Sequence, residues 1–151
     1  MDSSSISFTG HYTGHVWYEY GLSRQFFTSP AGHFLYHCLQ PIEFVTRLTA
    51  GFSIKDALLQ RHYVISHCIE QLIEEENVEQ VLEIGCGLSP RGYSFSRKYP
   101  HLHYIEADLP EMAKRKKELL TRRNAFGPNH KVITCDLFKS GAPNGLDHVL
   151  N

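Results

Sequence analysis

The chemistry offered by this sequence is concentrated in one turn that contains an acid and two glycines. Residues 81–84 form a short apolar run interrupted only by Glu83, and Gly85 and Gly87 follow at once. This pattern predicts a buried strand that ends in a tight turn. The glycines permit unusual backbone angles and close approach of a ligand, and Glu83 can accept hydrogen bonds from amines or hydroxyls. We therefore expect a ligand with amine or hydroxyl groups, and no phosphate, at this turn.

The same turn argues against two common nucleotide-binding motifs. A dinucleotide-binding turn, G-x-G-x-x-G, would have its third glycine at position 90, but the chain has Pro90 there. A P-loop would need a Gly-Lys-Ser/Thr ending, which is absent. An NAD-dependent enzyme is therefore a less favoured alternative.

Two further acids end strand-like segments downstream of the turn. Residues 101–108 predict a second strand that ends at Asp108, about 20 residues beyond the turn, where an acid can bind both hydroxyls of a ribose. Glu106 is the reserve candidate for that role. A third strand-like run ends at Asp136, which can serve an adenine amino group while Leu137 covers the ring.

Strands and helices alternate from residue 79 onward. Helices are expected over 91–99 and 110–123, and the basic run of the second, which includes Lys116, is expected to face solvent. The alternation predicts an α/β fold: a Rossmann-like parallel sheet with helices on both faces and a ligand at the carboxyl ends of the strands. Three strands make half of such a sheet, so we expect it to be truncated after the third.

The N-terminal part is expected to be helical and to differ in character from the rest. We assign residues 1–52 to an aromatic-rich helical region, which packs as a core or forms a lid over the ligand. We assign residues 53–151 to the N-terminal half of the Rossmann-like domain. Pro41 is expected to end a helix over 31–39.

A clear amphipathic helix follows this region. Ser53 can cap its start, and apolar residues recur at helical spacing to about residue 76. Arg61 lies beside the apolar stripe, where a guanidinium can hold a carboxylate bidentately. A surface arginine with no ligand is the open alternative.

Composition and charge exclude several classes of protein. The 15 basic and 16 acidic residues produce no field that would attract a polyanion, so nucleic acid is not an expected partner. No apolar run approaches the roughly 18 residues of a membrane span, and the N-terminus lacks a secretory signal, so we expect no membrane partner and a cytoplasmic location.

The cysteines and histidines do not form a recognised metal motif. The four cysteines are scattered singly, without a C-x-x-C pair, and are expected to be buried free thiols. His11 and His15, and likewise His33 and His37, are spaced to share a helix face, but no H-E-x-x-H motif or acid partner accompanies them. No metal site is therefore expected.

The acid-x-Gly-x-Gly turn resembles motif I of the class I S-adenosylmethionine-dependent methyltransferases. Over about residues 55–137 the chain resembles the leucine carboxyl methyltransferase family and its bacterial relatives. The segments that carry this resemblance are 59–62, 81–92, 104–110 and 135–137. The resemblance implies S-adenosylmethionine as cofactor. It also implies roles for four matching residues: Arg61 at the methionine carboxylate, Asp108 at the ribose, and Asp136 with Leu137 at the adenine.

Two functions follow as expectations. The first is methyl transfer to an oxygen of a carboxylate or small molecule, by this chain or with this chain as the cofactor-binding half; no catalytic residue is identified. The second is a non-catalytic interaction module derived from a methyltransferase. The exposed edge of a three-stranded sheet favours association, so a homo-oligomer is also an open alternative.

Overall fold

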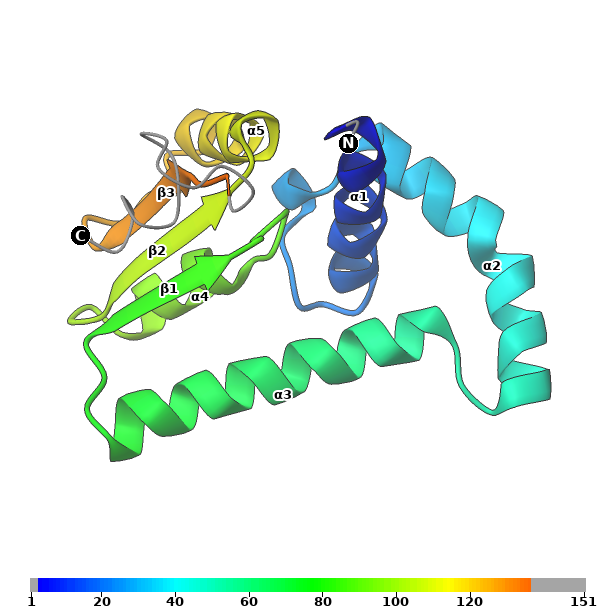
Figure 1. Ribbon diagram of the computed structural model, residues 1–151, viewed down its shortest axis with the longest axis horizontal. Helices are drawn as coiled ribbons and strands as arrows, with labels where there is room; N and C mark the ends of the chain where they lie inside the picture. Colours follow the sequence, from blue (N-terminus) through cyan, green and yellow to red (C-terminus); the bar gives the residue numbers. More distant parts are fainter. Residues whose placement is uncertain (1–2, 137–151) are drawn as a thin grey trace. The chain divides into compact units, whose positions relative to one another are not determined.

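The computed structural model describes residues 3–136, and the chain divides into two compact units, Met1–Val78 and Glu79–Asn151 (Figure 1). Within the described residues the first unit contains only helices, whereas the second contains a parallel sheet with helices.

The first unit is built from three long helices and one short 3₁₀ helix. Their bounds are α1 Ser3–Glu19, η1 Gln25–Phe27, α2 Pro30–Ala50 and α3 Ile54–Glu75. Its core contains Tyr12, Val16, Trp17 and Leu59. At the centre, the Tyr12 hydroxyl donates to Glu43 Oε1 at 2.9 Å, and the Lys55 backbone N–H donates to Glu43 Oε2 at 3.3 Å. One buried carboxylate therefore joins all three long helices.

Helix α2 continues through Pro41, so the expectation that Pro41 ends a helix is wrong. The helix instead begins and ends at capping residues. At its start Ser29 Oγ accepts from the Gly32 N–H at 3.0 Å, and after its last turn Gly51 has a φ of +76°. Figure 1 shows α2 as one curved ribbon. A proline inside a helix costs about 3 kcal/mol, which packing against α1 and two good caps can offset.

Helix α3 begins where the sequence predicts. Ser53 and Asp56 form a capping box, in which Ser53 Oγ accepts from the Asp56 N–H at 3.2 Å and Asp56 Oδ2 accepts from the Ser53 N–H at 3.1 Å. This start is confirmed.

The second unit confirms the α/β prediction of a Rossmann-like parallel sheet. Its elements are β1 Gln80–Ile84, α4 Arg91–Lys98, β2 His103–Asp108, α5 Pro110–Arg122 and β3 His130–Thr134. The strands are parallel in the order β1-β2-β3, with Glu83 paired to Glu106 and Asp108 paired to Thr134. In Figure 1 the three arrowheads point the same way, so the predicted acids lie at one end of the sheet.

Helices α4 and α5 both contact the same face of β2. Phe95 of α4 stacks on the Tyr104 ring at 6.0 Å between centroids, and Lys116 of α5 pairs with Glu106. Tyr104 and Glu106 are alternate residues of one strand and therefore point to one face. Right-handed crossovers between successive parallel strands produce this arrangement.

A charged cluster of Glu106, Lys116 and His130 is buried between the helices and the sheet. All three side chains are 0% exposed; Lys116 Nζ lies 2.5 Å from Glu106 Oε1, and His130 Nε2 lies 2.8 Å from Oε2. Two expectations are therefore wrong: Lys116 does not face solvent, and Glu106 is not available to a ribose. Lys116 points inward because it follows the buried Ala113 at helical spacing.

Gly92 allows helix α4 to approach this cluster. A β-carbon on Gly92 would collide with the Glu106 carboxyl carbon and would lie 2.6 Å from His130 Nε2. Only glycine therefore fits where the first turn of α4 crosses the buried carboxylate.

The charges of the cluster stabilise each other. Burial raises the pKa of Glu106, but the Lys116 charge and the His130 hydrogen bond outweigh it and lower that pKa below its ordinary 4.5. Burial lowers the pKa of Lys116, but Glu106 outweighs it and raises that pKa above its ordinary 10.5. The Glu106 contribution to stability is present above about pH 4.5 and is lost as pH falls through the lowered pKa. The Lys116 contribution is present below about pH 10.5 and is lost as pH rises through the raised one.

We expect Glu106→Gln to lower the free energy of unfolding by about 3 to 5 kcal/mol, because it leaves the Lys116 charge buried without its partner. Urea denaturation at neutral pH, followed by circular dichroism, measures this change. The double variant Glu106→Leu/Lys116→Met removes both charges and is expected to be more stable than Glu106→Gln. A double variant no more stable than the single one would contradict the ion-pair explanation.

The same pair predicts how stability depends on pH. The urea midpoint of the unsubstituted chain is expected to fall as pH decreases below about 4.5, the ordinary pKa of a glutamate here. The Glu106→Leu/Lys116→Met variant lacks the titrating carboxylate and is expected to show a shallower fall. Parallel curves for the two proteins would place the acid sensitivity elsewhere in the chain.

Candidate ligand site at the strand exits

The glycine turn has the backbone that the sequence predicts. Gly85 has a φ of +68° and Gly87 a φ of +51°, the left-handed region that favours glycine. The Gly85 N–H donates to the Ala107 carbonyl at 2.8 Å, which anchors the turn to β2. Within the part of the chain that the structure describes, no atom outside the adjoining residues lies within 4 Å of a β-carbon built on either glycine. The backbone is therefore open to a ligand at both positions.

Asp108, at the end of β2, holds the turn in place. Its Oδ2 accepts from the Gly87 N–H at 2.6 Å, and its Oδ1 accepts from the Leu109 N–H at 2.8 Å. The residue is 8% exposed. The structure thus brings together two residues, Gly87 and Asp108, that lie 21 positions apart in the sequence.

Asp136 lies just after β3, the strand that pairs with β2, at the same end of the sheet as Asp108. The Cys135 N–H donates to the Asp108 carbonyl at 2.8 Å, so the chain that leaves β3 is bonded to the end of β2. Asp136 itself is half-buried. Leu137, its expected partner at an adenine ring, lies outside the described residues.

Glu83 is paired with two side chains that the sequence reasoning missed. Glu83 Oε1 accepts from Arg91 Nε at 3.1 Å and also from Arg91 Nη2, while Oε2 accepts from the Tyr104 hydroxyl at 2.9 Å. One signal was available: Arg91 begins a helix, where the macrodipole disfavours a cation unless an acid is near. The Tyr104 contact had no comparable signal, because it depends on strand register.

The two donors to Glu83 stay protonated at neutral pH. Burial lowers the pKa of Arg91, but Glu83 outweighs it and the net direction is upward. Burial raises the pKa of Tyr104, and the Glu83 charge raises it further. The cluster is therefore a guanidinium and a phenol that both donate to one carboxylate.

The cysteine in the turn is not a nucleophile. Cys86 is buried, and burial raises the pKa of its thiol far above neutral pH. The expectation of buried free thiols is confirmed for Cys86 and Cys135 but is wrong for Cys38 and Cys68, which are exposed.

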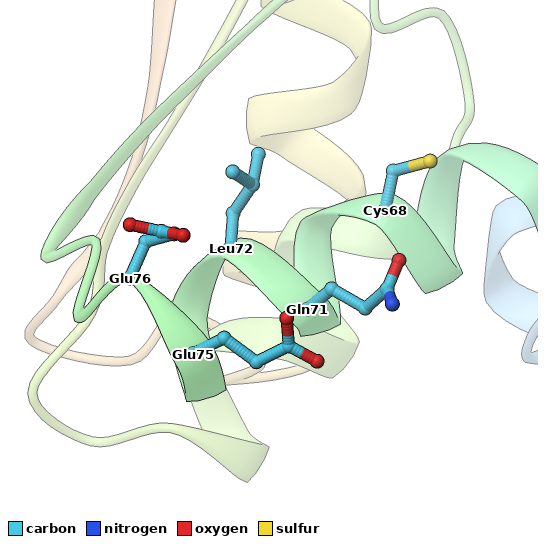
Figure 2. A pocket seen from close by; sticks show the side chains of 5 residues that line it. All are labelled: Cys68, Gln71, Leu72, Glu75 and Glu76. Atoms are coloured by element: carbon cyan, nitrogen blue, oxygen red, sulfur yellow. The ribbon is translucent and has the colours of Figure 1, made fainter.

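Arg61 lies on α3 in the first unit and is exposed. Its role at a cofactor carboxylate stays a prediction. Figure 2 shows a depression beside the C-terminal turns of the same helix, lined by Cys68, Gln71, Leu72, Glu75 and Glu76. None of these residues belongs to the glycine turn, and all come from one short stretch of chain, so the depression is not the predicted site.

Three histidines of the first unit pack against one another. The His15 and His33 rings are 5.0 Å apart between centroids, and those of His33 and His37 are 4.4 Å apart. Among residues 3–136 no group of three or more histidine, cysteine or acidic side chains is arranged to hold a metal ion. In that same range no helix has the length and apolar character needed to cross a bilayer.

Comparison with known families explains why these features occur together. The family model described as leucine carboxyl methyltransferase matches residues 43–149, more than half of the chain. The chain belongs to the leucine carboxyl methyltransferase family. The matched region contains α3, the glycine turn and all three strands, so family membership and the observed fold refer to the same residues.

A relative from Eremothecium gossypii, Leucine carboxyl methyltransferase 1, is 28% identical to this chain where the two align. The alignment covers 42% of this chain and 25% of the relative. The chain therefore spans about a quarter of the length of the relative that it matches. No solved structure is significantly similar to this chain.

The hydrogen bonds of Asp108 give a direct test of how the turn is held. We expect Asp108→Ala to weaken protection of the Gly87 amide against hydrogen exchange by about 1.5 to 3 kcal/mol, the usual contribution of a hydrogen bond to a charged group. Exchange measured by NMR reports this amide individually. Glu111→Ala, which removes an exposed acid from the first turn of α5, is the matched control. Unchanged exchange at Gly87 in the Asp108 variant would show that the turn is stable without the Asp108 side chain.

Proposed function

We propose that this chain binds S-adenosylmethionine at the exits of β1, β2 and β3. In this proposal it supplies the cofactor-binding half of a methyltransferase that acts on a carboxylate or small molecule. The observation that carries the proposal is the glycine turn, which is open to a ligand and bonded to the carboxylate of Asp108. The proposed division is a helical N-terminal region over 1–52 and a methyltransferase half-domain over 53–151.

The donor set fits a nucleoside that carries an amino acid and no phosphate. Carboxylates accept hydrogen bonds from hydroxyls and amines and repel phosphate, so acids at successive strand exits favour such a ligand. The residues that would hold it are Arg61 at the carboxylate, Glu83 at the amine, the Gly85 and Gly87 backbone against the ligand, Asp108 at the ribose, and Asp136 with Leu137 at the adenine.

Asp108 retains acceptor capacity for a ribose. Each of its oxygens accepts one backbone hydrogen bond, and a carboxylate can accept about four in all. The backbone bonds orient the carboxylate before a ligand arrives, which reduces the entropy lost on binding.

The bound cofactor would supply an electrophilic methyl group on sulfonium. The chain's part is to hold that group in line with an oxygen of the acceptor, and such alignment is a large source of rate acceleration. A carboxylate acceptor is ionised at neutral pH and needs no general base. The protonated thiol of Cys86 agrees with this, because it leaves no competing nucleophile at the turn.

One observation favours the alternative, a non-catalytic interaction module. Large apolar side chains are exposed on α2 and in the segment that connects it to α3, among them Phe44 at 65%, Leu48 at 71% and Phe52 at 57%. Exposed apolar surface of this kind is typical of protein–protein contacts. Light scattering coupled to size exclusion would show association, and the cofactor titration below separates the two functions.

Isothermal titration with S-adenosylmethionine tests the proposed function. The unsubstituted chain is expected to bind. Asp108→Ala is expected to bind about 10- to 100-fold more weakly, because it removes the charged carboxylate to which the ribose hydroxyls would donate. Glu111→Ala, on the exposed side of α5, is expected to bind as the unsubstituted chain does. A folded chain that does not bind, or an Asp108 variant with undiminished affinity, would count against the assignment. A stable oligomer that does not bind S-adenosylmethionine would instead favour the interaction module.

A further inference from the structure

We propose that Arg91 is the positioning residue for Glu83, and that through Glu83 it makes this site selective for an adenosine ligand with a free amino group. This inference rests on the proposed function and deepens it. Arg91 is the first residue of α4 and follows the glycine turn after Leu88, Ser89 and Pro90. Glu83 is the penultimate residue of β1. The pair therefore joins the two elements that flank the turn.

Arg91 and Tyr104 determine how the Glu83 carboxylate is oriented. Two nitrogens of the Arg91 guanidinium donate to Oε1, and the Tyr104 hydroxyl donates to Oε2. These contacts use three of the about four positions at which a carboxylate accepts hydrogen bonds. The remaining acceptor position is on Oε2. Glu83 is thus prepared to receive one further donor, such as an ammonium group.

The charge of Arg91 makes this arrangement tolerable inside the protein. The Glu83 side chain is 11% exposed, and a carboxylate so far removed from water is costly unless a cation pairs with it. The Arg91 side chain is 10% exposed and directs its fork at the carboxylate. Arg91 is therefore placed to act on a ligand through Glu83.

A positive charge alone does not explain this contact, because its geometry is specific to arginine. A guanidinium can donate from Nε and Nη2 at once, whereas an ammonium is a point charge on a flexible stem. The helix dipole disfavours a cation at the first position of α4, so this placement is explained by the acid that it holds. Lysine at position 91 would keep the charge but lose the fixed orientation.

The docking of α4 does not depend on Arg91 alone. Phe95 stacks on the Tyr104 ring, and Gly92 lies against the buried Glu106 cluster. These contacts are expected to keep the helix in place when Arg91 is substituted. The effect on ligand selection can then be measured in a folded protein.

The test compares two ligands that differ only in the amino group: S-adenosylhomocysteine and its deamino analogue. Isothermal titration of the unsubstituted chain is expected to show at least about tenfold preference for the ligand with the amine, the effect of one hydrogen bond to a charged group. Arg91→Met is expected to remove most of that preference while leaving affinity for the deamino analogue within about twofold. Arg91→Lys is expected to retain an intermediate preference.

A double variant shows whether Arg91 acts through Glu83. Glu83→Gln is expected to lose the preference as Arg91→Met does, and Glu83→Gln/Arg91→Met is expected to lose no more than either single variant. Additive losses would mean that Arg91 acts independently, and would overturn the inference. Arg97→Met, which removes an exposed arginine from the same helix, is the matched control and should change neither affinity.

Two results separate failure of this inference from failure of the proposed function. If the unsubstituted chain binds neither ligand, the proposed function fails and this inference fails with it. If Arg91→Met weakens both ligands equally, or leaves the preference intact, the function stands and the inference is overturned. Should Arg91→Met not fold, Tyr104→Phe removes only the donor to Oε2, and an unchanged preference in that variant and in Arg91→Lys would overturn the inference.

Discussion

The second unit depends on one carboxylate that has no contact with water. Glu106 lies on the face of β2 that α4 and α5 cover, and Lys116 and His130 bring α5 and β3 to its two oxygens. Such a cluster is unfavourable unless every charge has its partner, so all of its elements must be in place together. Gly92 adds a steric condition, because α4 reaches its position only where no side chain intervenes. The sheet and its helices therefore assemble around a polar centre.

A second carboxylate cluster, at the strand exits, is more accessible and serves a different purpose. Asp108 binds the backbone of the glycine turn, and Glu83 is held by Arg91 and Tyr104. Both acids keep part of their acceptor capacity after these contacts are counted. The inner Glu106 side chain is fully enclosed and stabilises the fold, whereas the outer acids lie beside a glycine turn that is open to a ligand. This difference separates a structural acid from a candidate ligand-binding acid.

Local patterns predicted much of this protein. The apolar run before Gly85, the capping residue Ser53 and the proline that begins α5 each act through short-range physical causes. The corresponding elements begin within a residue or two of their expected positions. The interpretation failed where two elements meet. Pro41 lies inside α2, whose caps and packing outweigh one local penalty. Lys116 is buried although Lys114 and Lys117, close to it in the sequence, are exposed.

The sequence by itself determined the type and order of the elements in the second unit, and the family to which the chain belongs. The physical reason is that strand and helix periodicities and the acid-glycine turn are local patterns formed by residues close together in the chain. Only the tertiary structure decided which acid is enclosed and which borders the glycine turn. Glu106 and Asp108 are two residues apart on one strand, yet the first is enclosed by partners from α5 and β3 and the second faces the turn. Burial and pairing depend on residues distant in the chain, and no local pattern encodes them.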